Sequence, residues 1–309
     1  MELTSWNETR GLSEMKSFLD GLGIETNSFL LGSGQSVPDD ADIVIVASPQ
    51  VPLSEEEAFY LQGYLTERRG SMLLLLDPVQ GMENHGLQLL LRPWGLSCHD
   101  MRLVEPAVER SYLAPYRTLA YNRKDSHPIV AHLAKHNISL KLFPQASRGR
   151  PVLPLRQAPA RVTVTNLITT SEASWAEDDW RQRIVNIDPQ RRNLALNVAG
   201  PVAFAAAAER KVRSKHDINI PGGKLIVFGN STLFSNIGLE HHGNRSLFAN
   251  VSHWLLDENE FLDIPPQSIR RYDMELDANE YRSLLYHLAL VPGIVALIGF
   301  SRRILRRDA

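Results

Sequence analysis

The apolar positions of the first hundred residues follow two different periods. Uninterrupted apolar runs within 42–47 and 72–76 predict strands that are buried on both faces of a sheet. Apolar side chains three and four residues apart at 11–22 and 54–70 predict amphipathic helices, and Ser54 with Glu57 forms a capping box at the start of the second helix. This alternation predicts an α/β fold with a mostly parallel, doubly wound sheet covered by helices on both faces.

Shorter patterns extend this prediction along the chain. Further strands are expected at 1–4, 24–31, 96–104, 138–143, 161–170 and 224–229, and further helices at 85–91, 129–135 and 244–256. The small-residue run within 194–210 fits either a strand or a packed helix. The polar or proline-rich stretches 147–160 and 171–190 are expected to be loops.

The last thirty residues have the pattern of a membrane span. Residues 283–300 contain no Asp, Glu, Lys or Arg, and eighteen helical residues reach roughly 27 Å, close to the ~30 Å hydrocarbon core of a bilayer. A buried core helix would show a similar run, but the arginine-rich ending favours a transmembrane helix at 281–301 with a basic tail at 302–309. The residues predicted for helix packing and for orientation in the lipid bilayer are Pro292, Gly293, Ala296, Gly299, Arg302, Arg303, Arg306 and Arg307.

Basic residues beside a span stay on the cytoplasmic side, so we expect a single-pass protein of the bacterial inner membrane with a cytoplasmic C-terminus. A linker at 263–280 would then join the span to a periplasmic domain at 1–262, for which a subdivision near 105–190 stays open. The first twenty residues lack a signal peptide, so we expect the chain to be a piece of a longer protein with an earlier membrane helix. The net charge is −2, of which the tail contributes +3, and the resulting −5 of the remainder argues against nucleic-acid binding.

Several motifs, weak alone, together resemble a known family in their order and spacing. They are Ser54-Glu55-Glu56-Glu57, Leu76-Asp77-Pro78, Gly229-Asn230-Ser231, Asn244-Arg245 and Trp254-Leu255. The chain resembles the auxiliary, extracytoplasmic component of gliding-motility-type (GldG-like) ABC transport systems. The resemblance implies a flavodoxin-like or class I glutamine-amidotransferase-like fold, with an ABC permease and an ATPase as partners. Many members have a Gly-His-Gly-Glu turn where this chain has Ser5-Trp6-Asn7-Glu8.

Motifs of enzymes, metals and nucleotides are weak in this sequence. Cys98 precedes His99 and Asp100, but neighbouring residues of a strand point to opposite faces, so a catalytic triad is not expected. The glycine-containing stretch 32–36 lacks the lysine of a P-loop, and His241-His242 lacks further ligands for a metal. We therefore predict no enzyme activity, no cofactor and no metal. Four arginines offer a contact for an anion, although a solvated loop is favoured: Arg148, Arg150, Arg156 and Arg161.

Ligands of doubly wound sheets bind at the carboxyl ends of the strands. The polar residues predicted at these ends are Ser5, Asn7, Glu8, Ser48, Gln50, Asp77, Asn230 and Ser231. They suit hydrogen bonding to an envelope glycan or a peptide, although they could equally be helix caps and turn residues. We therefore predict a non-enzymatic, membrane-anchored auxiliary subunit that couples an ABC permease and ATPase to an extracytoplasmic substrate or envelope partner. The alternatives are a membrane-tethered amidotransferase-like hydrolase and a sugar-binding module.

Overall fold

The computed structural model describes residues 11–32, 35–77, 85–99, 101–104, 117–121, 127–136, 138, 140–142, 149–177, 198–213 and 219–257. Two compact units divide the chain, Met1–Pro266 and Gln267–Ala309, and all described residues belong to the first unit. The predicted strand at 1–4, the linker, the transmembrane helix at 281–301 and the basic tail lie outside the described residues. Within the described part, no helix combines the length and apolar character needed to cross a bilayer.

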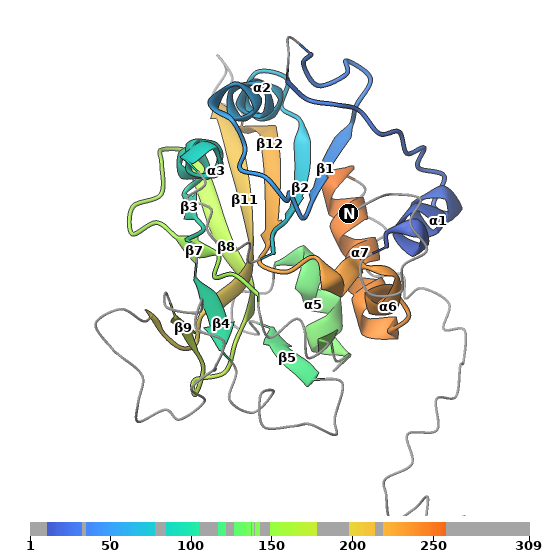
Figure 1. Ribbon diagram of the computed structural model, residues 1–309, viewed down its shortest axis with the longest axis vertical. Helices are drawn as coiled ribbons and strands as arrows, with labels where there is room; N and C mark the ends of the chain where they lie inside the picture. The colour runs from blue at the N-terminus through green and yellow to red at the C-terminus, as the bar shows by residue number, and fades with distance from the viewer. Residues whose placement is uncertain are drawn as a thin grey trace, which may run out of the picture. The chain divides into compact units, whose positions relative to one another are not determined.

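Seven strands form one mixed sheet (Figure 1). In spatial order they are β1 (Ile43–Ala47), β2 (Ser71–Leu75), β12 (Asn219–Phe228), β11 (Ala203–Arg213), β8 (Val162–Thr169), β5 (Arg117–Tyr121) and β6 (Leu140–Leu142). The small-residue run that fitted a strand or a helix is β11. Its alanines alternate between the two faces, and Ala205 to Ala208 are all buried.

The prediction of a mostly parallel sheet is wrong. Strands β1, β2 and β12 pair in parallel, whereas β11, β8, β5 and β6 each pair antiparallel with their neighbours. Only residues 214–218 separate β11 from β12, which is too short for the crossover that a parallel pair requires. The chain therefore returns as a hairpin, and the parallel half of the sheet is limited to three strands.

Helices cover both faces of the sheet, as predicted (Figure 1). Helices α2 (Glu55–Thr66) and α3 (His85–Leu91) contribute to an apolar cluster on one face together with Met72, Leu74 and Val227. Helices α1 (Ser13–Gly21), α5 (Pro128–Lys135), α6 (Asn236–Leu239) and α7 (His242–Leu255) contribute to a second cluster with Leu73 and Ile226. Adjacent residues of β2 and of β12 thus enter opposite clusters, as the two-residue period of a strand requires.

Several smaller predictions need correction. The stretch 24–31 forms no strand, and the apolar side chain of Leu30 is 83% exposed. The strand expected at 96–104 is divided into β3 (Leu96–Ser97) and β4 (Arg102–Val104), which pair outside the main sheet with β7 (Leu153–Pro154) and β9 (Trp175–Glu177). These short strands also interrupt the loops expected at 147–160 and 171–190, and β9 pairs in addition with β10 (Val198–Ala199).

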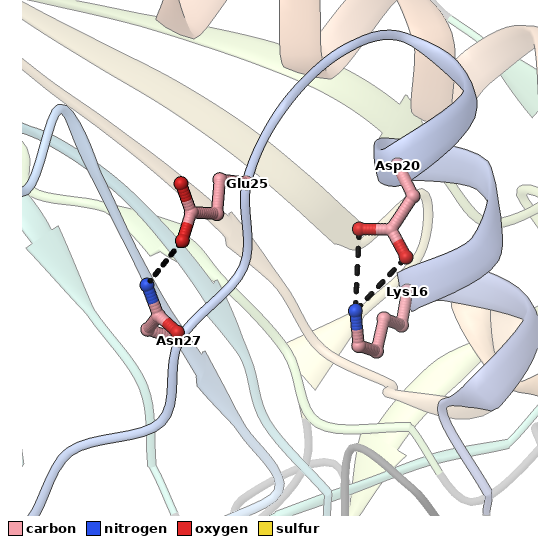
Figure 2. Close-up of polar contacts among 4 residues, drawn as sticks. All are labelled: Lys16, Asp20, Glu25 and Asn27. Carbon is pink, nitrogen blue, oxygen red and sulfur yellow. Dashed lines mark hydrogen bonds and ion pairs between the residues drawn. The ribbon is translucent and has the colours of Figure 1, made fainter.

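The helix ends follow local rules. Ser54 Oγ accepts from Glu57 N at 3.1 Å and the Glu57 carboxylate accepts from Ser54 N at 2.8 Å, which confirms the capping box of α2. Phe59 on the same helix is 73% exposed, although the apolar spacing over 54–70 predicted that it would be buried. In α1, Lys16 forms an ion pair with Asp20 one turn later at 2.9 Å, and Figure 2 shows this pair beside the Asn27–Glu25 hydrogen bond of the following loop.

Candidate functional site

The three parallel strands end at one edge of the sheet. Ala47 of β1 is in register with Leu75 of β2, and Leu75 is in register with Phe228 of β12. The pairing continues one residue further, because Ser48 N donates to Leu75 O and Leu76 N donates to Phe228 O, both at 2.8 Å. The residues that follow these strands are therefore held side by side.

Asp77 is the centre of the hydrogen bonds at this edge. Its Oδ2 accepts from Ser48 Oγ at 2.6 Å and from Ser231 Oγ, while its Oδ1 accepts from Ser231 N at 2.8 Å. Ser48 is 3% exposed and Ser231 is fully buried. An ionised carboxylate only accepts hydrogen bonds, so Asp77 ties the ends of β1 and β12 to the end of β2. We call Ser48, Gln50, Asp77 and Ser231 the strand-end cluster.

Ser48 occupies a backbone conformation that side chains rarely adopt. Its φ is 48°, in the left-handed region that costs an L-residue about 1–2 kcal/mol. Exposed Gln50 donates from Nε2 to Ser48 O at 2.9 Å and to Ser48 Oγ at 3.0 Å. The bonds from Gln50, Asp77 and Leu75 together hold Ser48 in this strained conformation.

Asn230 has a different role from the rest of the predicted set. Its Oδ1 accepts from Thr232 N at 2.8 Å and from Thr232 Oγ1, so it stabilises the turn that begins the short 3-10 helix Thr232–Phe234. The structure therefore brings together four of the eight predicted strand-end residues and assigns Asn230 to a neighbouring turn. Ser5, Asn7 and Glu8 lie outside the described residues.

The serine hydroxyls of the strand-end cluster are engaged within the cluster. Both serine hydroxyls donate to a carboxylate, and none of the described hydrogen bonds joins either serine to a histidine. Cys98 is buried among the apolar side chains that α2 and α3 cover, where it packs as a small apolar side chain. The arrangement holds hydroxyl, amide and carboxylate groups in fixed positions, with exposed Gln50 at its outer side.

A further segment packs directly on the end of β12. Arg150 N donates to Gly229 O at 2.6 Å, and the carbonyl of Gly149 accepts from Leu103 N at 2.7 Å. Gly229 has no room for a side chain, because a Cβ there would lie 1.9 Å from Arg150 O. Arg150 is 4% exposed, so the prediction of a solvated loop is wrong for this residue. It holds for Arg156 and Arg161, which are exposed, while Arg148 lies outside the described residues.

Two polar groups beyond this edge, one buried and one half-buried, escaped the sequence analysis. Lys224 in β12 is 3% exposed, and its Nζ donates to Trp254 O and to Asp257 Oδ1, both at 2.5 Å. His127 caps α5 and stacks edge-on against Trp254 with ring centroids 5.0 Å apart. Burial and the nearby Lys224 charge lower the pKa of His127 from 6.5 to about 4, so it is neutral at pH 7. In the sequence, only the position of Lys224 at the start of an apolar strand pattern indicated this pair.

The remaining predicted residues do not form a described site. The ends of the glycine-containing loop bond to each other, since Gly32 and Gln35 exchange both backbone hydrogen bonds. His242 is the first residue of α7, and no group of three metal-binding side chains occurs among the residues that the structure describes. The packing and anchor residues from Pro292 to Arg307 lie outside the described residues.

Comparison with known proteins identifies the family. The chain is similar to a solved structure described as "mmIFT52 N-terminal domain", with 18% identity, a TM-score of 0.44, and coverage of 71% of this chain and 78% of that chain. No protein with a curated description matches it. A family model described as "ABC-type uncharacterized transport system" matches residues 7–257 of the 309, which confirms the resemblance stated from the sequence motifs. The chain therefore belongs to this family, as an auxiliary component of an ABC-type transport system.

Proposed function

We propose that this chain is a non-enzymatic subunit of a bacterial ABC transport system, anchored in the inner membrane by residues 281–301. The observation that carries the proposal is the family match over residues 7–257. The apolar run at 283–300 and the arginines that follow it support the anchor and a cytoplasmic C-terminus. In this arrangement the α/β domain lies in the periplasm, and the partners are the permease and the ATPase.

The role proposed for the α/β domain is to present a rigid recognition surface. Helices that pack their apolar sides on both faces fix the sheet, and the bonds to Asp77 fix the strand ends. A polar ligand such as an envelope glycan or a peptide would bind at the strand-end cluster, and permease motion would reach the domain through the span and the linker. The likeness to flavodoxin-like and amidotransferase-like folds stays a prediction. It applies only to the parallel half of the sheet, because the other half is antiparallel.

Affinity purification of the full-length chain from its native membranes tests this proposal. Extraction should require detergent, and a mild detergent should retain a permease and an ATPase detectable by mass spectrometry. A matched variant that lacks residues 281–309 should lose both partners. Full-length chain that is soluble without detergent, or a reporter fused after Ala309 that is active on the periplasmic side, would contradict the anchor and its orientation.

The hydrolase alternative has a separate test. Cys98→Ser removes the one thiol of the chain and, because the position is buried in an apolar cluster, should lower stability slightly. Capture of permease and ATPase by this variant should equal that of wild type. Amidohydrolase activity in the wild type that disappears with Cys98→Ser would favour the enzyme instead.

A further inference from the structure

Basic side chains gather at the edge of the sheet opposite the strand-end cluster. The register places Arg210, near the end of β11, beside Val162 at the start of β8, and it places Glu209 beside Lys224 of β12. Lys224 is in turn beside Ser71, the first residue of β2. These positions therefore lie at the edge where β2 begins, whereas the strand-end cluster lies where β2 ends.

Hydrogen bonds join the basic segments at this edge. Lys211 N donates to Arg161 O at 2.9 Å, so the end of β11 contacts the residue that precedes β8. Arg210 Nη2 donates to Pro93 O at 3.2 Å, which attaches the 3-10 helix Arg92–Trp94 to β11. Two strands and one short helix therefore contribute charge to the same corner of the domain.

The segment before β8 adds a further arginine. Leu155 N donates to Gly95 O at 2.8 Å, directly after the 3-10 helix, and Arg156 follows in the chain. Four of the five basic residues are exposed and Arg210 is half-buried. We call the five residues the basic corner: Arg92, Arg156, Arg161, Arg210 and Lys211.

The segments of the basic corner do not balance its charge. Residues 92–95, 155–161 and 209–211 contain a single carboxylate, Glu209, and so have a net charge of +4. The connection 212–218 between β11 and β12 contains Arg213, Lys215 and Asp217, which add a further +1. The acidic residues at 39–42 belong to the segment before β1, which is four strands away from β8 in the sheet. The corner is therefore positive on a chain whose residues before the tail sum to −5.

The opposite edge carries the reverse charge. Helix α2 ends shortly before β2 begins, so its first turn lies toward the carboxyl ends of the strands. That turn contains Glu55, Glu56 and Glu57, and Asp77 of the strand-end cluster lies at the same edge. An anionic surface would therefore attract the basic corner and repel the edge with the strand-end cluster.

The chain leaves the described domain at the basic edge. Lys224 Nζ donates to Trp254 O and to Asp257 Oδ1, both at 2.5 Å, which holds the end of α7 at the start of the parallel part of β12. Residues 258–280 then lead to the span proposed at 281–301. Such a tether keeps the corner at a high effective concentration beside a bilayer, so a weak attraction is enough for contact.

We propose that the basic corner binds the headgroups of anionic lipids and thereby turns the strand-end cluster away from the membrane. Each Lys or Arg within a Debye length of an anionic bilayer adds to the attraction, and guanidinium groups form paired hydrogen bonds with phosphate. The inference rests on the proposed anchor and adds an orientation to it. The recognition surface then faces the periplasm, where an envelope ligand reaches it.

Energy transfer from a donor dye on the full-length chain to acceptor dyes on lipid headgroups tests this orientation. The donor is attached to Ala160→Cys beside the basic corner or to Val51→Cys beside the strand-end cluster, both exposed positions, each with Cys98→Ser. The chain is reconstituted in vesicles of phosphatidylcholine, with or without phosphatidylglycerol. With phosphatidylglycerol, transfer should be more efficient from position 160 than from position 51, and high salt should reduce the difference. Equal transfer from both positions, or the same difference in neutral vesicles, would overturn the proposal.

Matched charge variants locate the attraction. Arg156→Gln with Lys211→Gln removes two exposed charges from the corner and should at least halve the difference in transfer between the two dye positions. Lys16→Gln with Lys135→Gln removes the same charge from α1 and α5, which cover the opposite face of the sheet from α2 and α3, and should leave the difference unchanged. Equal losses in the two double variants would assign the effect to net charge and contradict a localised site.

Flotation with the same vesicles distinguishes a failed corner from a failed anchor. An anchored chain floats with both lipid compositions and stays bound in high salt. A chain that floats only with phosphatidylglycerol and is released by salt would support the corner and contradict the anchor, and a chain that floats with neither would contradict both. Unchanged energy transfer in the Arg156/Lys211 double variant, combined with loss of the permease on purification, would mean that the corner binds protein and would overturn the lipid proposal.

Discussion

The two halves of the sheet use polar residues in different ways. In the parallel half, β1, β2 and β12 all end at one edge, and Asp77 gathers the polar residues that follow them. In the antiparallel half, neighbouring strands end at opposite edges of the sheet. A polar bond there joins the end of one strand to the start of the next. An example is Thr170 after β8, whose Oγ1 bonds with Ser174 Oγ and accepts from Val202 N. Strand direction therefore decides where polar residues from three strands can meet in this domain.

The largest expected effect of a single substitution is at Asp77. Asp77→Ala leaves two buried hydroxyls and the Ser231 N–H without their acceptor, and should lower the free energy of unfolding by about 2–4 kcal/mol, since each unsatisfied buried donor costs about 1–3 kcal/mol. Denaturant unfolding measures this change. The matched variant in the antiparallel half is Thr170→Ala, which should cost less because it removes a neutral side chain. A larger loss for Thr170→Ala than for Asp77→Ala would contradict the central position given to Asp77.

The antiparallel half should respond to volume rather than to lost hydrogen bonds. Ala206 of β11 is fully buried and faces the cluster beneath α2 and α3. Ala206→Leu adds three carbons to a closed core and should destabilise the domain by about 1–3 kcal/mol. Thermal unfolding measures the loss, with Ala160→Leu at an exposed position as control. An Ala206→Leu protein as stable as wild type would show that this face has unfilled space.

Two variants of Ser48 distinguish the effect of its hydroxyl on stability from the effect of its backbone strain. Ser48→Ala loses the bond to Asp77 and keeps the left-handed backbone, whereas Ser48→Gly loses the same bond and relieves the strain. Ser48→Gly should therefore be more stable than Ser48→Ala by about 1 kcal/mol, as measured by chemical denaturation. The reverse order would mean that φ at this position carries no cost.

The smallest effect is a pH dependence near the end of α7. The pKa of His127 is lowered to about 4 in the folded protein, so between pH 4 and 6.5 the unfolded chain binds more protons than the folded one. The free energy of unfolding should then fall as the pH drops through this window, by roughly 0.5 kcal/mol between pH 7 and pH 6. His127→Asn keeps a capping side chain for α5 and should remove this part of the fall. An identical pH profile for the two proteins would rule out His127 as the cause.

The sequence predicted the strands of the parallel half well, and in the antiparallel half it predicted β8 and β6 but neither β5 nor the strand directions. Strands β2 and β12, helix α2 and its capping box follow from local patterns that need no distant partner. The direction of β11 depends on a short connection and on pairing with β8, which lies more than thirty residues earlier. The apolar period does not encode that pairing. Residues 24–31 show the reverse error, because their alternating pattern predicted a strand and the structure forms none there.

The candidate site was predicted to a similar degree. Ser48, Gln50, Asp77 and Ser231 could be placed together because parallel strands end at a common edge. Arg150 was singled out with three other arginines, but its burial results from the close approach of the 149–152 segment to Gly229. Gly149 lies in a stretch that was predicted to be a loop and Gly229 ends a predicted strand, and nothing in either local pattern indicated that contact. Burial of this kind is a property of tertiary packing.

The most direct test of the account compares what co-purifies with three full-length proteins: wild type, the double variant Ser48→Ala with Ser231→Ala, and Thr170→Ala. Quantitative mass spectrometry after mild-detergent extraction should find permease and ATPase with all three, since these contacts are assigned to the span. Envelope glycan or peptide ligands should be depleted from the Ser48/Ser231 variant alone. Equal ligand capture by all three proteins, or greater loss with Thr170→Ala, would contradict the claim that the parallel half of the sheet carries the recognition surface.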